Sequence, residues 1–225
     1  MAKYVFDRIC ALVGLLVLWP VMLVIAACIM TNMPGGSVIF RQLRVGKNGK
    51  LFVIYKFRTM RLPRETDREP CRQERVGDVA DNPRVSSCGT TVTVMGDSRV
   101  TPLGATLRRW KLDELPEIYN VLIGDMSFVG PRPDVPGYAD KLEEEDREIL
   151  LLRPGITGPA SMKYRDEENL LARQADPKSY NDRVIWPDKV RINRYYLRHY
   201  SFAKDLQMIV CTVLGMKMKY NNETI

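Results

Sequence analysis

The chain has 225 residues, of which 45% are hydrophobic and 27% are charged. This length allows one domain with a substantial core, and the composition excludes a disordered or histone-like chain. The formal net charge of +7 predicts an anionic partner: nucleic acid, anionic lipid or a phosphorylated substrate. The five cysteines form no CxxC pair and the chain has a single histidine, so we expect no disulfide framework, no zinc site and a reducing, cytosol-facing compartment.

The N-terminal segment, residues 1–34, is strongly apolar. Residues 9–30 include no Asp, Glu, Lys, Arg or His, and a helix of that length would cover roughly 33 Å, enough to cross a bilayer core of about 30 Å. Pro20 lies near the middle, where it kinks a helix. Basic residues flank both ends, so the positive-inside rule gives no orientation. Two interpretations remain open: an ordinary kinked span, or a helix that breaks at Pro20 and returns to the same face.

The rest of the chain, residues 35–225, predicts a compact, mostly helical α/β domain with a small β-hairpin. Two β-rich runs, 37–42 and 51–57, are separated by a Gly-containing loop and predict that hairpin. Polar, turn-rich residues 61–97 are expected to form a surface insertion, with a β-like piece at 90–95. Helical periodicity covers 105–123 with a kink or restart at Pro116, and helices are also predicted at 137–152 and twice within 188–218.

The densest group of chemically useful side chains lies at residues 108–116. Asp113 and Glu114 are adjacent, so on a helix they point about 100° apart, and one can meet a substrate while the other binds a metal or holds a neighbour. Arg108 and Arg109 keep cations within reach, which favours ionised carboxylates of the kind that a nucleophile or a Mg²⁺ ligand requires. The same pattern is also typical of an exposed helix face with ordinary ion pairs.

Four further cations are candidates for phosphate binding: Lys56, Arg58, Arg132 and Arg153. Lys56 and Arg58 alternate at the end of a β-run, Arg132 lies between two prolines, and Arg153 precedes Pro-Gly. Rigidly held arginines suit bidentate phosphate recognition, although each taken singly is more often a surface cation. Together they predict a pocket for a lipid phosphate or a nucleotide diphosphate. The sequence has neither a GxxxxGK[ST] nor a GxGxxG motif, so a P-loop or Rossmann site is not supported.

Four motifs in order resemble the bacterial sugar transferase family, the monotopic phosphoglycosyl transferases. They are 56–60 (KFRTM), 112–116 (LDELP), 124–133 (GDMSFVGPRP) and 153–158 (RPGITG). The resemblance implies transfer of a sugar-1-phosphate from a UDP-sugar to polyprenol phosphate, usually undecaprenyl phosphate, with release of UMP. This is the initiating step of membrane glycoconjugate assembly. It also implies a membrane-lipid environment, the cytosolic face of a bacterial inner membrane, and no nucleic-acid partner.

The same resemblance implies roles for particular residues. It maps an Asp-Glu dyad that works with Mg²⁺ onto Asp113 and Glu114, with the Asp as a nucleophile that forms a covalent aspartyl-phosphosugar. Lys56, Arg108 and Arg132 correspond to phosphate or nucleotide contacts, and Arg153 corresponds more weakly. The family's N-terminal helix is re-entrant, with a break at a central proline and both ends in the cytosol.

The sequence also departs from the family pattern. Trp19 precedes Pro20 where the family often has Ser, residues 159–165 (PASMKYR) differ from the usual continuation, and Asn193 occupies a commonly acidic position. An alternative from another class is a membrane-anchored basic protein that binds anionic lipid or nucleic acid without catalysis. Such a protein would bind polyanions with a steep salt dependence. The sequence leaves open the donor sugar, the glycan pathway and the oligomeric state, including a homo-oligomer.

Overall fold

The computed structural model describes residues 2–61 and 99–225. The predicted insertion at 61–97 and its β-like piece at 90–95 lie almost entirely outside the described residues. The α-helices are α1 (Ala2–Asn32), α2 (Pro102–Arg109), α3 (Glu117–Ile123), α4 (Pro159–Lys163), α5 (Glu167–Ala172), α6 (Pro177–Tyr180), α7 (Trp186–Arg198) and α8 (Phe202–Leu214). Four 3₁₀ turns are described: η1 (Lys47–Gly49), η4 (Leu112–Glu114), η5 (Ala139–Lys141) and η6 (Glu144–Leu151). A π-helical turn, η7 (Asn181–Ile185), precedes α7. The strands are β1 (Ile39–Val45), β2 (Leu51–Phe57), β3 (Ser127–Val129), β4 (Gly155–Thr157), β5 (Lys219–Tyr220) and β6 (Glu223–Thr224).

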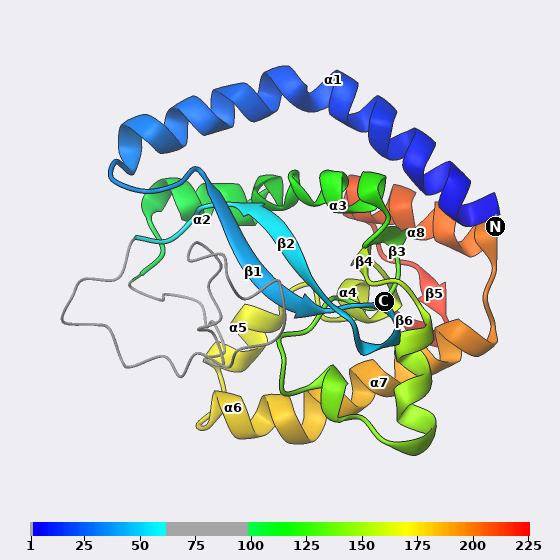
Figure 1. Cartoon of the computed structure of the whole chain (residues 1–225). Helices are drawn as coiled ribbons and strands as arrows, with labels where there is room; N and C mark the ends of the chain where they lie inside the picture. Colours follow the sequence, from blue (N-terminus) through cyan, green and yellow to red (C-terminus); the bar gives the residue numbers. More distant parts are fainter. Residues whose placement is uncertain (1, 62–98) are drawn as a thin grey trace.

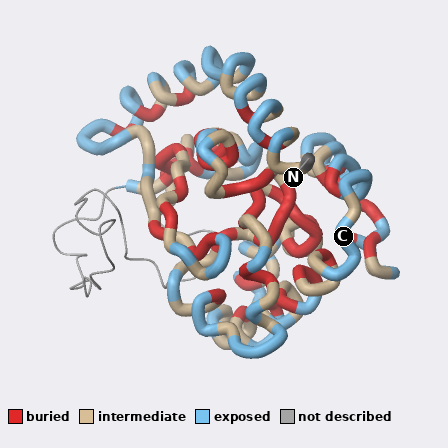
Figure 2. Tube along the Cα trace, turned by 45° about the vertical axis from the view of Figure 1, so that its right-hand side comes forward, coloured by how far each residue is buried: buried red, intermediate tan, exposed pale blue. Residues whose placement is uncertain are grey.

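Helix α1 is long and apolar enough to cross a membrane. It continues through Pro20 without interruption and arches over the rest of the molecule, with both ends beside the domain (Figure 1). One face, including Ala11, Ile25 and Ile29, packs against the domain, while the opposite face is exposed (Figure 2). The large side chains on that exposed face are apolar: Val5, Ile9, Leu12, Val13, Leu16, Val17, Trp19, Val21, Leu23, Val24 and Met30. Water is a poor solvent for such a surface, so α1 is suited to contact lipid.

The predicted hairpin is confirmed, with β1 and β2 paired antiparallel from Ile39 opposite Phe57 to Val45 opposite Leu51. Helix α3 covers one face of it. The fully buried Asn120 on α3 joins the two elements, because its Nδ2 donates to the Val53 carbonyl at 2.7 Å and its Oδ1 accepts from the Tyr55 amide at 3.2 Å. A buried amide with both ends satisfied fixes the position of α3 on the hairpin.

Strands β3 and β4 form a short parallel pair that brings two distant loops together. Three glycines make this contact close enough. A Cβ on Gly155 would lie 2.1 Å from the Gly130 amide nitrogen, and a Cβ on Gly158 would lie 2.2 Å from the Gly130 carbonyl oxygen. No side chain fits at these distances, so the glycines are required for the backbones to cross. The crossing holds in place the segments that carry Arg132 and Arg153.

The helical predictions were confirmed in part. Helices α7 and α8 occupy the predicted region 188–218 closely, and α3 begins after Pro116, as expected. The prediction of an α-helix over 137–152 was wrong, because the chain forms the 3₁₀ turns η5 and η6 there. Gly137 and Glu144 adopt positive φ angles of 105° and 46°, which interrupt a right-handed helix at those positions.

Candidate active site

The dyad lies in a turn between two helices. Helix α2 ends at Arg109, and Lys111 then adopts a left-handed conformation with φ 56°. This reversal starts the 3₁₀ turn Leu112–Glu114, and Pro116 directs the chain into α3. The turn points both acids inward, so that Asp113 and Glu114 are each only 8% exposed. The alternative of an exposed helix face with ordinary ion pairs is therefore wrong.

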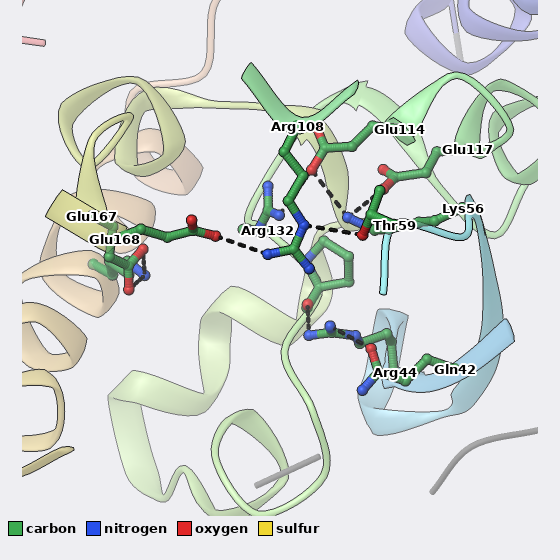
Figure 3. Close-up of polar contacts among 12 residues, drawn as sticks. Gln42, Arg44, Lys56, Thr59, Arg108, Glu114, Glu117, Arg132, Glu167 and Glu168 are labelled. Carbon is green, nitrogen blue, oxygen red and sulfur yellow. Dashed lines mark hydrogen bonds and ion pairs between the residues drawn. The ribbon is translucent and has the colours of Figure 1, made fainter. Parts of the chain in front are cut away.

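Two cations hold Glu114. Its Oε1 accepts from Lys56 Nζ at 3.0 Å and from an Arg132 Nη2 at 2.9 Å (Figure 3). Burial acts to raise the pKa of Glu114, but Lys56 and Arg132 outweigh burial and hold the pKa well below its usual range. Glu114 is therefore an ionised carboxylate at neutral pH.

Lys56 also forms an ion pair with a second buried acid, Glu117, at 2.9 Å between Nζ and Oε1. Burial raises the pKa of Glu117, and Lys56 offsets this only in part. Glu117 was not among the residues predicted from the sequence, because it resembles an ordinary acidic residue in the first turn of a helix. A signal was present in its spacing, since residues three apart on a helix share one face.

Asp113 has a buried carboxylate oxygen, Oδ1, with neither a hydrogen bond nor an ion pair among the described residues. Glu117 Oε1 also lacks a hydrogen bond, but it is paired with Lys56. Burial raises the pKa of Asp113, and the positive charge of Lys56 opposes that rise. A buried carboxylate oxygen without a partner suits either nucleophilic attack or ligation of Mg²⁺, which prefers carboxylate oxygens.

The described residues contain no group of three His, Cys, Asp or Glu side chains that could hold a metal alone. Mg²⁺ often binds through one or two carboxylates together with water and substrate phosphates. Asp113 and Glu114 are the pair that would hold it here.

Further cations surround the dyad. Arg108 donates from Nε to Thr59 Oγ1 at 3.0 Å and pairs with Glu168 of α5 (Figure 3). Arg44, which the sequence analysis missed, donates to the Pro133 carbonyl at 3.1 Å. Burial, together with the positive charge of Arg132, lowers the pKa of Arg44 to about 10. The side chain of Arg132 remains 41% exposed, so its guanidinium can reach a substrate.

The structure brings together five of the seven predicted site residues: Lys56, Arg108, Asp113, Glu114 and Arg132. It places the other two at opposite ends of α1. Arg58 is buried and donates to the Met33 carbonyl just beyond the end of the helix. Arg153 lies over the ring of Tyr4 near the start of the helix, 4.1 Å from the ring centroid.

A buried acid pair with fixed cations, beneath a helix of membrane-spanning length, defines a site for anionic groups at a lipid surface. Residues 1–219 match the profile described as Bacterial sugar transferase, and the chain belongs to that family. It is 34% identical to the UDP-glucose:undecaprenyl-phosphate glucose-1-phosphate transferase of Xanthomonas campestris pv. campestris, over 97% of this chain and 40% of that protein.

Two other relatives differ in how much of their length is matched. The exopolysaccharide production protein PSS of Rhizobium leguminosarum bv. phaseoli is 35% identical, over 95% of this chain and 94% of that protein. The undecaprenyl-phosphate galactose phosphotransferase of Salmonella typhimurium is 28% identical, over 93% of this chain and 39% of that protein. The chain thus spans about two fifths of the longer relatives and nearly all of the shorter one.

Proposed function

We propose that this chain transfers a sugar-1-phosphate from a UDP-sugar to undecaprenyl phosphate and releases UMP, the initiating step of membrane glycoconjugate assembly. The observation that carries the proposal is the buried, unpaired oxygen of Asp113 beside the Glu114, Lys56 and Arg132 cluster. The names of the Xanthomonas and Salmonella relatives describe this kind of transfer to undecaprenyl phosphate.

The geometry supports a two-step mechanism. Asp113 attacks the phosphorus that carries the sugar, forming a bond from its carboxylate oxygen and breaking the bond between that phosphorus and the oxygen of the leaving UMP. An oxygen of undecaprenyl phosphate then attacks the same phosphorus, and Asp113 leaves as a carboxylate. Two steps allow a water-soluble donor and a lipid acceptor to use one site in turn.

The cations in the site stabilise the charge of these steps. Arg132 and Arg108 can contact the donor phosphates, and Lys56 keeps Glu114 ionised and in place. Bound Mg²⁺, held by Asp113 and Glu114, would neutralise charge on the diphosphate.

Helix α1 is proposed to be re-entrant, entering the cytosolic leaflet of the bacterial inner membrane and returning near Pro20. Contacts at its two ends support this topology, because Lys3 pairs with Asp205 and the Met33 carbonyl accepts from Arg58, so one domain holds both ends. Single cysteines at positions 2 and 48, in a cysteine-free background, should both react with a reagent applied from the cytosolic side. Reaction of either from the opposite side would establish a true crossing.

The activity test is UMP release by purified protein with Mg²⁺, undecaprenyl phosphate and a panel of UDP-sugars. Wild type should release UMP with at least one donor, and Asp113→Asn should abolish release while the protein stays folded. Asp140→Asn, at an exposed position, is the matched control and should retain activity. Full activity in Asp113→Asn would exclude the nucleophile assignment. Steeply salt-dependent polyanion binding without UMP release would favour the binding protein instead.

A further inference from the structure

Lys3, in the first turn of the apolar helix, has a buried polar environment. Its ammonium donates to the Val129 carbonyl at 2.8 Å and to Tyr196 Oη at 2.9 Å, and it forms an ion pair with Asp205. Tyr196 in turn donates to Asp205 Oδ1 at 2.7 Å. Asp205 is 2% exposed and Tyr196 is 1% exposed. All three donors of the ammonium are therefore used inside the protein.

A second polar contact lies one helical turn further along α1. Asp7, which is buried, accepts from Ser127 Oγ at 2.7 Å. Lys3 and Asp7 thus contact the two ends of the same short strand, since β3 runs from Ser127 to Val129. The start of the membrane helix therefore fixes one side of β3, and β4 fixes the other through the parallel pairing.

Strand β3 leads directly into the active site. After Val129 the chain continues through Gly130 and Pro131 to Arg132, whose guanidinium contacts Glu114. The Gly130 amide donates to Thr157 at 2.9 Å, and prolines on both sides of Arg132 restrict its backbone. Because residues 130–131 are restrained in this way, a displacement of Val129 should also displace Arg132.

We propose that Lys3 is a positioning residue for Arg132: its fully bonded ammonium fixes β3 and thereby sets the guanidinium of Arg132 beside Glu114. Stability alone is a weak reason for this arrangement, because a buried ion pair often contributes no more than apolar side chains of similar size. The membrane helix is accordingly part of the active-site scaffold as well as an anchor. The kinetic assay of this proposal rests on the proposed function.

We call the contacts of Lys3 with Val129, Tyr196 and Asp205 the latch. The kinetic test is a double-mutant cycle between the latch and Arg132. We expect Lys3→Met and Asp205→Asn each to lower kcat/KM for the UDP-sugar by about 10- to 100-fold, because a small misplacement of a catalytic group costs rates of this order. In an Arg132→Met background the same substitutions should cost less than about 3-fold, since they act through a group already removed. Lys3→Arg should restore most of the activity. Lys204→Gln, exposed on α8, is the matched control and should change nothing.

Two kinetic results would overturn the proposal. One is an equal loss in both backgrounds, which would mean that Lys3 acts on the fold in general. The other is full activity in Lys3→Met and Asp205→Asn. If Lys3→Met does not fold, the same comparison is made with the isosteric Asp205→Asn only, in the wild-type and Arg132→Met backgrounds.

A second measurement does not depend on activity. Amide hydrogen exchange in the full-length protein should become faster in segment 127–132 of Asp205→Asn, while the β1–β2 hairpin keeps its protection. Unchanged exchange in 127–132 would refute the latch whatever the enzyme does. If the wild type releases no UMP but exchange in 127–132 is faster in Asp205→Asn, the structural role of the latch is supported and the proposed function is refuted.

Discussion

Lys56 bridges two buried carboxylates, so its removal should destabilise the protein in a way that depends on pH. In Lys56→Met, Glu114 and Glu117 lose the ammonium that lies 3.0 and 2.9 Å from their oxygens. Each contact corresponds to about 5 kcal/mol at an effective dielectric constant near 20. Loss of one partner of a buried ionic group typically costs about 3–5 kcal/mol after desolvation is counted, and we expect a loss of this size at pH 8.

The pH dependence follows from the two pKa values. In wild type the pKa of Glu114 lies well below its usual range, so its stabilising effect is present at both pH 8 and pH 5.5. In Lys56→Met, Arg132 still lies 2.9 Å from Glu114 and keeps its pKa low, whereas the pKa of Glu117, already raised by burial, should rise further because Lys56 no longer opposes burial. The folded state of the variant therefore takes up a proton on Glu117 as the pH falls, and the destabilisation should shrink by about 1–2 kcal/mol between pH 8 and pH 5.5.

Denaturant titration in detergent at the two pH values measures this difference. The double variant Lys56→Met/Glu117→Gln should recover part of the loss at pH 8, because one of the two like charges is gone. Lys50→Met, at an exposed lysine, is the matched control and should change stability by less than about 0.5 kcal/mol. A loss of equal size at pH 8 and pH 5.5, without recovery in the double variant, would refute the electrostatic reasoning.

Three further predictions concern the scaffold. Gly130→Ala should lower the melting temperature sharply or prevent folding, because its Cβ would lie 2.3 Å from the Arg153 carbonyl oxygen, whereas Gly14→Ala meets its nearest atom at 3.8 Å and should be tolerated in the same thermal melt. Asn120→Ala should cost about 1–3 kcal/mol in denaturant titration, since backbone groups of β2 lose their partner. Burial raises the pKa of Asp134 to about 6, so ionisation above that pH is unfavourable in the fold; Asp134→Asn should melt higher than wild type at pH 8, and the difference should vanish near pH 4.

The elements that the sequence predicted well are those whose pattern repeats along the chain. The β1–β2 hairpin has two β-rich runs around glycines, and α7 and α8 have regular apolar spacing. The β3–β4 pair is only three residues long on each strand, and its partners are far apart in sequence, so no local pattern signals it. The acidic run at 137–152 has helical composition, yet positive φ angles interrupt it.

The residues of the site also separate into those that the sequence predicts and those that depend on tertiary packing. Asp113 and Glu114 could be predicted, because adjacent acids among cations form a visible pattern. Arg58 looked equivalent to Lys56, but it turns toward the end of α1 and donates to a carbonyl there. Which way a rigid arginine points depends on what packs beside it, and that is a tertiary property. The burial of Glu117 depends in the same way on the packing of α3 against the hairpin.

The attachment of α1 at both ends makes the length of this helix a fixed quantity. Lys3 and Met33 are each bound to the domain, and the helix between them is continuous. One inserted residue would turn one attachment point about 100° relative to the other and shift it by about 1.5 Å. The face of α1 that packs on the domain would then no longer point toward it along the whole helix. The exposed apolar side chains of α1 can be exchanged for other apolar side chains, but the number of residues between Lys3 and Met33 cannot change without breaking one attachment.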